Sequence, residues 1–235
     1  MLKIEVCFTP ALLDLYKIED SIVVVIDILR ATSSITYGLD NGAKAIIPVM
    51  EVDDCEPYRE DGHLLAAERN GMVVEGFDFG NSPFSYTKEK VEGKTIVLTT
   101  TNGTKAMRLA QKRAYKVVVG SFLNLEALCI WLASQQKNVL LLCAGWKDKF
   151  NLEDSLFAGA VVERLRKDFV HFDDASVAAE DLYQLAKNDL RNYLHKSSHS
   201  HRLAKLNIEE DVQFCLQLSI CDTIPVLIEN RLVSL

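Results

Sequence analysis

Short runs of apolar, largely β-branched residues recur along this chain, and polar turns and segments with helical periodicity separate them. The most apolar run spans residues 22–26, reads IVVVI and stops at Asp27. Continuous apolar runs of this length are typical of strands that are buried on both faces. Strands that alternate with helices predict an α/β protein with three α/β/α layers around a mostly parallel or mixed sheet.

The pattern predicts the order of the elements. Strands are expected at residues 3–8, 22–29, 43–49, 94–100, 115–120, 138–143 and 226–229. Helices are expected at residues 32–39, 104–111, 125–134, 153–167, 176–191 and 209–218, so the C-terminal part should be rich in helix. Residues 63–69 fit either a strand or a helix.

Composition limits the domain organisation and the class of partner. With 49% hydrophobic residues, the 235-residue chain can bury one sizeable core. We expect one compact unit over residues 1–235, or two closely packed α/β halves that divide near residues 115–125. The net charge of −7 and the lack of a basic arm argue against nucleic acid as a partner.

The sequence also indicates a compartment. It has no secretory signal and no apolar run long enough to cross a membrane, so we expect a cytoplasmic protein without membrane contact. None of the six cysteines forms a Cys-x-x-Cys pair, which predicts buried free thiols.

Three strand-to-helix junctions carry polar chemistry, at the edge where ligands bind in parallel α/β sheets. At the first, Asp27 ends a strand, Arg30 follows, and Thr32 and Ser33 open a helix. Asp27 could hold a metal or act on water, while Arg30, the hydroxyls and the helix-start amides could hold an anion. Alternatively, a hydroxyl caps the helix and Arg30 pairs with a nearby acid.

The second junction reads TTTNGTK. Asn102, Gly103, Thr104 and Lys105 could bind a second anionic group of a small substrate, because Gly103 permits close backbone approach and Lys105 adds charge. The alternative is an ordinary turn with a threonine cap. A loop at residues 76–83, GFDFGNSP, could similarly offer Asn81 to a ligand together with Ser82, or be a structural turn.

At the third junction, Lys147, Asp148 and Lys149 lie in a loop before Glu153 and Asp154 at a helix start. Adjacent carboxylates there could ligate magnesium, which prefers oxygen ligands. Acidic residues are also favoured at helix starts by the helix dipole alone.

Three histidines, at positions 195, 199 and 201, lie in a polar segment without zinc-site spacing, although His199 could reach the site as a proton donor. Common phosphate-handling motifs are absent from the sequence: the P-loop, the dinucleotide-binding glycine motif and the Gly-x-Ser-x-Gly elbow.

Seven motifs occur in one order along the chain. They are DILRATSSI, the Glu68-Arg69 pair in LLAAERNG, GFDFGNSP, LTTTNGTKA, SFLN, CAGW and LEDSLFAGA. Together they resemble the 2-phosphosulfolactate phosphatase family over residues 20–225, and the tail SSHSHRLAKL followed by Asp211 resembles it too. Ser200 departs from the small residue, often glycine, that relatives carry there, which weakens any role for His199.

The resemblance implies an activity. Such enzymes hydrolyse (2R)-2-phospho-3-sulfolactate to 3-sulfolactate and phosphate with Mg²⁺, a reaction of coenzyme M biosynthesis in methanogens. A homodimer is the expected assembly. Alternatives are a phosphatase for another phosphorylated hydroxy acid or sugar phosphate, a non-catalytic anion-binding module on the same fold, and a subunit whose main role is assembly.

The expected site combines the junctions with the resemblance. Asp27, Glu153 and Asp154 are expected to hold Mg²⁺, and Asp27, Arg30 and Glu68 to act in catalysis. Substrate binding is expected from Thr32, Ser33, Arg69, Asn81, Ser82, Asn102, Gly103, Thr104 and Lys105. Glu68 and Arg69 could instead form a structural ion pair. Direct attack by water and a phospho-aspartyl intermediate on Asp27 both remain open.

Overall fold

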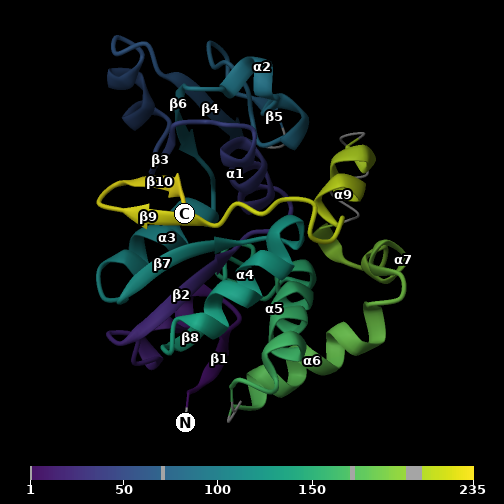
Figure 1. Ribbon diagram of the computed structural model, residues 1–235. Helices are drawn as coiled ribbons and strands as arrows, with labels where there is room; N and C mark the ends of the chain where they lie inside the picture. The colour runs from purple at the N-terminus through teal and green to yellow at the C-terminus, as the bar shows by residue number, and fades with distance from the viewer. Residues whose placement is uncertain (1, 70–71, 170–172, 200–207) are drawn as a thin grey trace.

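The computed structural model describes residues 2–69, 72–169, 173–199 and 208–235, and within them the strands form one ten-stranded sheet (Figure 1). The strands are β1 (Ile4–Cys7), β2 (Ser21–Ile26), β3 (Ala45–Val49), β4 (Leu64–Arg69), β5 (Met72–Val73), β6 (Thr95–Thr99), β7 (Lys116–Gly120), β8 (Asn138–Cys143), β9 (Pro225–Ile228) and β10 (Arg231–Ser234). The segment that fitted either a strand or a helix is therefore a strand, β4.

Helices fill most of the connections between the strands. The α-helices are α1 (Ala31–Asp40), α2 (Lys88–Val91), α3 (Gly103–Gln111), α4 (Leu125–Ser134), α5 (Leu152–Leu165), α6 (Asp174–Ala186), α7 (Leu190–Leu194) and α9 (Glu209–Cys215). Short 3-10 helices are η1 (Pro10–Leu15), η2 (Asp53–Tyr58), η3 (Pro83–Ser85) and η4 (Phe122–Asn124). The predicted α/β/α class with a helix-rich C-terminal part is confirmed.

One predicted helix is wrong. The expected single helix at residues 176–191 is two helices, α6 and α7, with a break between them. The break has a local cause, because the Asp189 side chain accepts a hydrogen bond from the backbone N–H of Asn192 at 3.0 Å and starts a new helix.

The sheet contains two parallel groups joined by an antiparallel hairpin. The order is β1-β8-β2-β7-β9-β10-β3-β6-β4-β5, with parallel pairing from β1 to β7 and again from β3 to β4. The β9–β10 hairpin, yellow in Figure 1, pairs antiparallel with β7 on one side and β3 on the other. Three successive antiparallel pairings mean that the two groups run in opposite directions.

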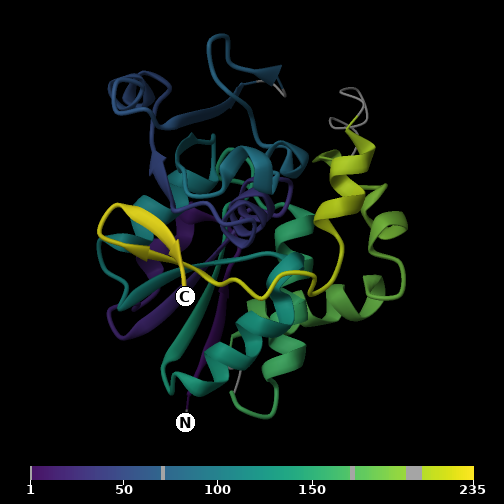
Figure 2. The same cartoon turned by 45° about the horizontal axis from the view of Figure 1, so that its top comes forward.

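Strand β2 is buried on both faces, as its sequence predicts. Ile22, Val24 and Ile26 belong to a core cluster with α4, α5 and α6, the helices gathered on one side of the sheet in Figures 1 and 2. Val23 and Val25 belong to a second cluster with α1 and α3. The second cluster also contains side chains from β3, β4, β6 and β10, so α1 and α3 pack against both groups of strands.

Two further sequence expectations concern cysteines and membranes. All six cysteines are free and buried, as predicted. None of the helices in the described ranges combines the length and the apolar character that crossing a membrane requires.

Candidate active site

Asp27 directly follows β2 and is partly buried. Its backbone N–H donates to the Thr32 hydroxyl at 3.1 Å, and its carbonyl accepts from the Thr32 N–H at 2.9 Å, which fixes the turn into α1. The carboxylate faces the start of α3, where the Gly103 N–H donates to it. A Cβ on Gly103 would lie 2.9 Å from Asp27 Oδ2, so this approach requires glycine.

Burial, together with the neighbouring carboxylates of Glu153 and Glu68, raises the pKa of Asp27 to about 6 against the lowering effects of His199 and the Gly103 N–H. The first two junctions and the start of α5 therefore meet around one carboxylate. This convergence of segments that are far apart in sequence defines the candidate site.

Asp154, in the first turn of α5, is fully buried and ties two loops together. Its Oδ1 accepts from the Ile28 N–H at 2.9 Å, and its Oδ2 accepts from the Gly145 N–H at 3.1 Å. Burial, followed by the charges of Asp27 and Glu153, raises its pKa well above the ordinary range. Because both oxygens hold backbone amides, Asp154 positions the loops around the site.

Glu153 is buried beside it and uses only one of its two oxygens. Oε1 accepts from Asn151 Nδ2 at 3.3 Å and contacts Nδ1 of His199. Oε2 is buried and has no hydrogen-bond partner among the residues that the structure describes. A buried acceptor without a donor lowers the stability of the folded protein, so this oxygen is a candidate contact for a ligand.

The cluster fits a magnesium ion held by two carboxylates rather than three. Asp27 and the free Glu153 oxygen are hard donors, and Mg²⁺ in phosphate-handling sites commonly takes one or two carboxylates with waters and phosphate oxygens. Asp154 has both oxygens engaged, and no three His, Cys, Asp or Glu side chains in the described part of the chain are arranged as a metal site.

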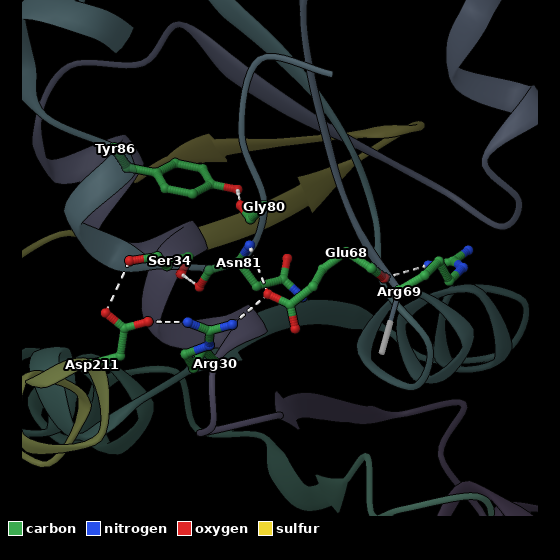
Figure 3. A network of polar contacts seen from close by, with 9 residues as sticks. Arg30, Ser34, Glu68, Arg69, Gly80, Asn81, Tyr86 and Asp211 are labelled. Carbon is green, nitrogen blue, oxygen red and sulfur yellow. Dashed lines mark hydrogen bonds and ion pairs between the residues drawn. The ribbon is translucent and has the colours of Figure 1, made fainter. Parts of the chain in front are cut away.

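Arg30 is buried between two carboxylates, as Figure 3 shows. Nη1 pairs with Asp211 of α9, and Nη2 pairs with Glu68 at the end of β4. The structure thus matches the alternative in which Arg30 pairs with nearby acids. The peptide bond between Leu29 and Arg30 is cis.

The alternative of a structural ion pair between Glu68 and Arg69 is wrong, because Glu68 pairs with Arg30 instead. The Arg69 guanidinium donates to the Glu68 carbonyl at 2.9 Å and to the Thr99 hydroxyl at 3.4 Å. Arg69 therefore joins β4 to β6 at the edge of the site.

The loop at residues 76–83 is held on the same network (Figure 3). The Asn81 N–H donates to Glu68 Oε2 at 3.4 Å, while its side-chain oxygen is buried and has no partner within the described ranges. The Ser82 hydroxyl donates to Asp211 Oδ1 at 2.9 Å. Asn81 thus keeps an open acceptor, whereas Ser82 is engaged in the network.

Three hydroxyls that were expected to bind substrate instead form hydrogen bonds with nearby backbone groups of their own turns. Ser33 donates to the Ile28 carbonyl at 2.9 Å, Thr104 donates to the Thr100 carbonyl at 2.8 Å, and Thr32 accepts from Asp27. All three residues are fully buried. The structure does not support hydroxyl contacts to a ligand at these positions, because tight turns use these groups first.

The loop between β8 and α5 covers the start of α3. The Lys147 N–H donates to Asn102 Oδ1 at 3.3 Å, and the Lys105 ammonium donates to both Asp148 oxygens at 2.8 Å. In the same loop, the Trp146 ring stacks on His199 with centroids 5.9 Å apart. Lys105 and Asn102 therefore do lie at the site, but Lys105 is paired with Asp148.

Sequence reasoning missed one residue of the site and left another aside. Asp211 pairs with Arg30, and its only signal was the similarity of the tail to the family. His199 contacts Glu153, so it does reach the site, as the sequence allowed, although it was not among the expected site residues. His195 is exposed at the end of α7, while His201 lies outside the described residues, as does most of the SSHSHRLAKL tail.

Comparisons with known proteins cover nearly the whole chain. A family model described as 2-phosphosulpholactate phosphatase matches residues 7–230. A probable 2-phosphosulfolactate phosphatase of Thermotoga petrophila is 44% identical over 213 residues, 91% of this chain and 92% of that protein. Proteins with the same description from Caldanaerobacter subterraneus and Clostridium novyi are 43% identical over 216 residues (89% of each chain) and 34% identical over 228 residues (95% of this chain, 96% of that one).

Proposed function

The chain belongs to the 2-phosphosulpholactate phosphatase family, and we propose that it hydrolyses (2R)-2-phospho-3-sulfolactate to 3-sulfolactate and inorganic phosphate with Mg²⁺. It is a phosphoric monoester hydrolase, as its family and its relatives indicate. The substrate comes from the relatives' names, and the metal comes from the chemistry of the site.

The observation that carries the proposal is the free Oε2 of Glu153 beside the raised-pKa carboxylate of Asp27. Two acidic groups brought together in a partly dry site repel each other unless a cation shares them. Bound there, Mg²⁺ would neutralise phosphate charge in the manner usual for phosphoryl transfer.

The protein's own groups hold this arrangement in place. Asp154 fixes the Asp27 turn through the Ile28 N–H and the opposite loop through the Gly145 N–H. His199 orients Glu153 through Nδ1, and Trp146 stacks on the imidazole. Preorganised positions of this kind remove reorganisation from the reaction itself.

Lys105 and the start of α3 suit the end of the substrate that carries no phosphate. A substrate with phosphate, carboxylate and sulfonate needs separate sites for its negative groups, because they repel one another. The Lys105 ammonium is half-exposed and pairs with the carboxylate of Asp148, which a negative group of the substrate would replace. We assign the sulfonate or carboxylate end of the substrate to Lys105.

A panel of phosphorylated acids tests the substrate. The purified protein would be supplied in Mg²⁺ with phosphosulfolactate, phospholactate, 2-phosphoglycerate and glucose 6-phosphate, and phosphate release would be measured. We expect the highest kcat/KM with phosphosulfolactate. A higher value with another compound would transfer the assignment to that compound, and no release from any of them by folded protein would favour an anion-binding module.

A further inference from the structure

Asn151 occupies the position just before α5, where a side chain normally caps the helix. Its backbone is extended, with φ −126° and ψ 155°, as is usual for a capping residue. Asparagine there ordinarily accepts a hydrogen bond from an N–H of the first turn. In this structure, however, the Asn151 side chain makes no capping hydrogen bond.

The side chain is held by other contacts. Its Nδ2 donates to Glu153 Oε1 at 3.3 Å, and its backbone carbonyl accepts from the Ser155 hydroxyl at 2.7 Å. Since only the NH₂ group can face a carboxylate favourably, this contact fixes which way the amide points. Oδ1 then turns away from Glu153 Oε1, and it is buried without a partner in the described part of the chain.

Two neighbouring side chains thus each present a buried oxygen that accepts nothing. Besides Asn151 Oδ1, this holds for Oε2 of Glu153, whose side chain is 1% exposed. Buried polar atoms nearly always have a hydrogen-bond partner. Two acceptors without one, on side chains that are hydrogen-bonded to each other, therefore call for one common explanation. A hard cation satisfies both at once.

We propose that Asn151 Oδ1 is a ligand of the Mg²⁺ ion that Glu153 Oε2 and Asp27 hold, an inference that rests on the proposed function. The metal then has three protein oxygens, one of them from an uncharged side chain. Two carboxylates match the charge of one Mg²⁺, and a third would repel a phosphorylated, sulfonated substrate. An amide oxygen adds coordination without adding negative charge.

Metal binding without substrate tests this directly. The full chain and its variants would be titrated with MgCl₂ by calorimetry, and with Mn²⁺ followed by electron paramagnetic resonance. Asn151→Leu, similar in size but without a donor oxygen, should weaken Mg²⁺ binding at least about tenfold. Asn151→Asp should bind Mg²⁺ at least as tightly as the wild type but raise the KM for substrate. Should the leucine variant not fold, Asn151→Ala takes its place.

Ser155→Ala is the matched control, because it removes the hydroxyl that holds the Asn151 backbone but no proposed ligand. It should change Mg²⁺ affinity less than about threefold. The metal-free melting temperature of Asn151→Leu should fall only slightly, because the variant loses the 3.3 Å contact to Glu153 Oε1 but no capping bond. Wild-type affinity in Asn151→Leu, or an equal loss in Ser155→Ala, would overturn the assignment of Asn151 alone. A wild-type protein that binds neither metal would overturn the magnesium proposal itself.

Discussion

Asp27, Glu153 and Asp154 form an acidic cluster in which negative charge is concentrated by the fold. The pKa values of Asp27 and Asp154 are raised by burial first and then by the other carboxylates. This arrangement opposes stability in the free protein, since like charges are forced together. A cluster of carboxylates that destabilises the free protein, but would be stabilised by a bound cation, is typical of a functional site.

Replacement of Asp27 tests that interpretation. Asp27→Asn should lower kcat by at least about a thousandfold, because it removes a proposed metal ligand at the reacting phosphate. The melting temperature without metal should stay level or rise, since one of the repelling carboxylates is gone. Phosphate release and a thermal melt measure the two effects.

The matched control is Asp20→Asn, which removes one negative charge at an exposed surface pair with Lys137. It should leave kcat unchanged. An Asp27→Asn variant that kept near-normal turnover would remove Asp27 from the reaction.

Lys105 and Asp148 give a second prediction at this scale. Lys105→Ala should raise KM about tenfold and change kcat less, because a charge-assisted contact to the substrate is lost. Asp148→Asn should instead lower KM, by at most about fivefold, because the exposed pair is worth little. Steady-state kinetics separate the two effects, and a rise in KM with Asp148→Asn would mean that Asp148 orders the loop rather than competing with substrate.

Residue types were predicted better than the directions in which side chains point. The sequence placed Asp27, Glu153 and Lys105 at strand-to-helix junctions, and they lie at the site. It could not show that Ser33 and Thr104 turn back onto their own backbone, because that depends on the geometry of each turn. Nor could it show which of Glu153 and Asp154 keeps a free oxygen.

At the scale of elements, Arg30 joins three segments that are distant in sequence. Its guanidinium connects α1 to Glu68 of β4 and to Asp211 of α9, and its side chain is 4% exposed. The sequence alone left Arg30 either in contact with an anion or paired with a nearby acid. The structure gives it a bridging role, which changes the expected consequence of replacing it.

Arg30→Met should destabilise the protein by about 3–5 kcal/mol, because it leaves the buried Asp211 and the partly buried Glu68 without their partner. Urea denaturation measures the change in the free energy of unfolding. Arg59→Met is the control, since Arg59 pairs with Glu56 at the surface with 46% and 52% of the side chains exposed, and it should cost no more than about 1 kcal/mol. Equal midpoints for wild type and Arg30→Met would contradict the bridging role.

Elements with strong patterns were predicted, whereas the short strands β5 and β10 and the short helix α2 were not. β2 follows from its continuous apolar run, but β10 has only four residues and alternates weakly in burial. Its place between two parallel groups is decided by pairing with β9 and β3, which no local pattern encodes.

In the whole molecule, the chain forms the first two strands of one parallel group, crosses to the other group, and returns with β7 and β8. Residues around Asp27 and around Gly103 meet because α1 and α3 share a core that includes strands of both groups. The expected domain organisation and the homodimer stay predictions, and light scattering on a size-exclusion column measures the latter.

The most direct test of the proposed magnesium-dependent reaction is to measure phosphate release from phosphosulfolactate under three conditions. These are with Mg²⁺, after addition of excess chelator, and after Mg²⁺ is restored. Because Asp27 and Glu153 are proposed to act through the ion they hold, activity should fall to background with chelator and return with Mg²⁺. Full activity in chelator, from protein shown to be free of metal, would contradict the account.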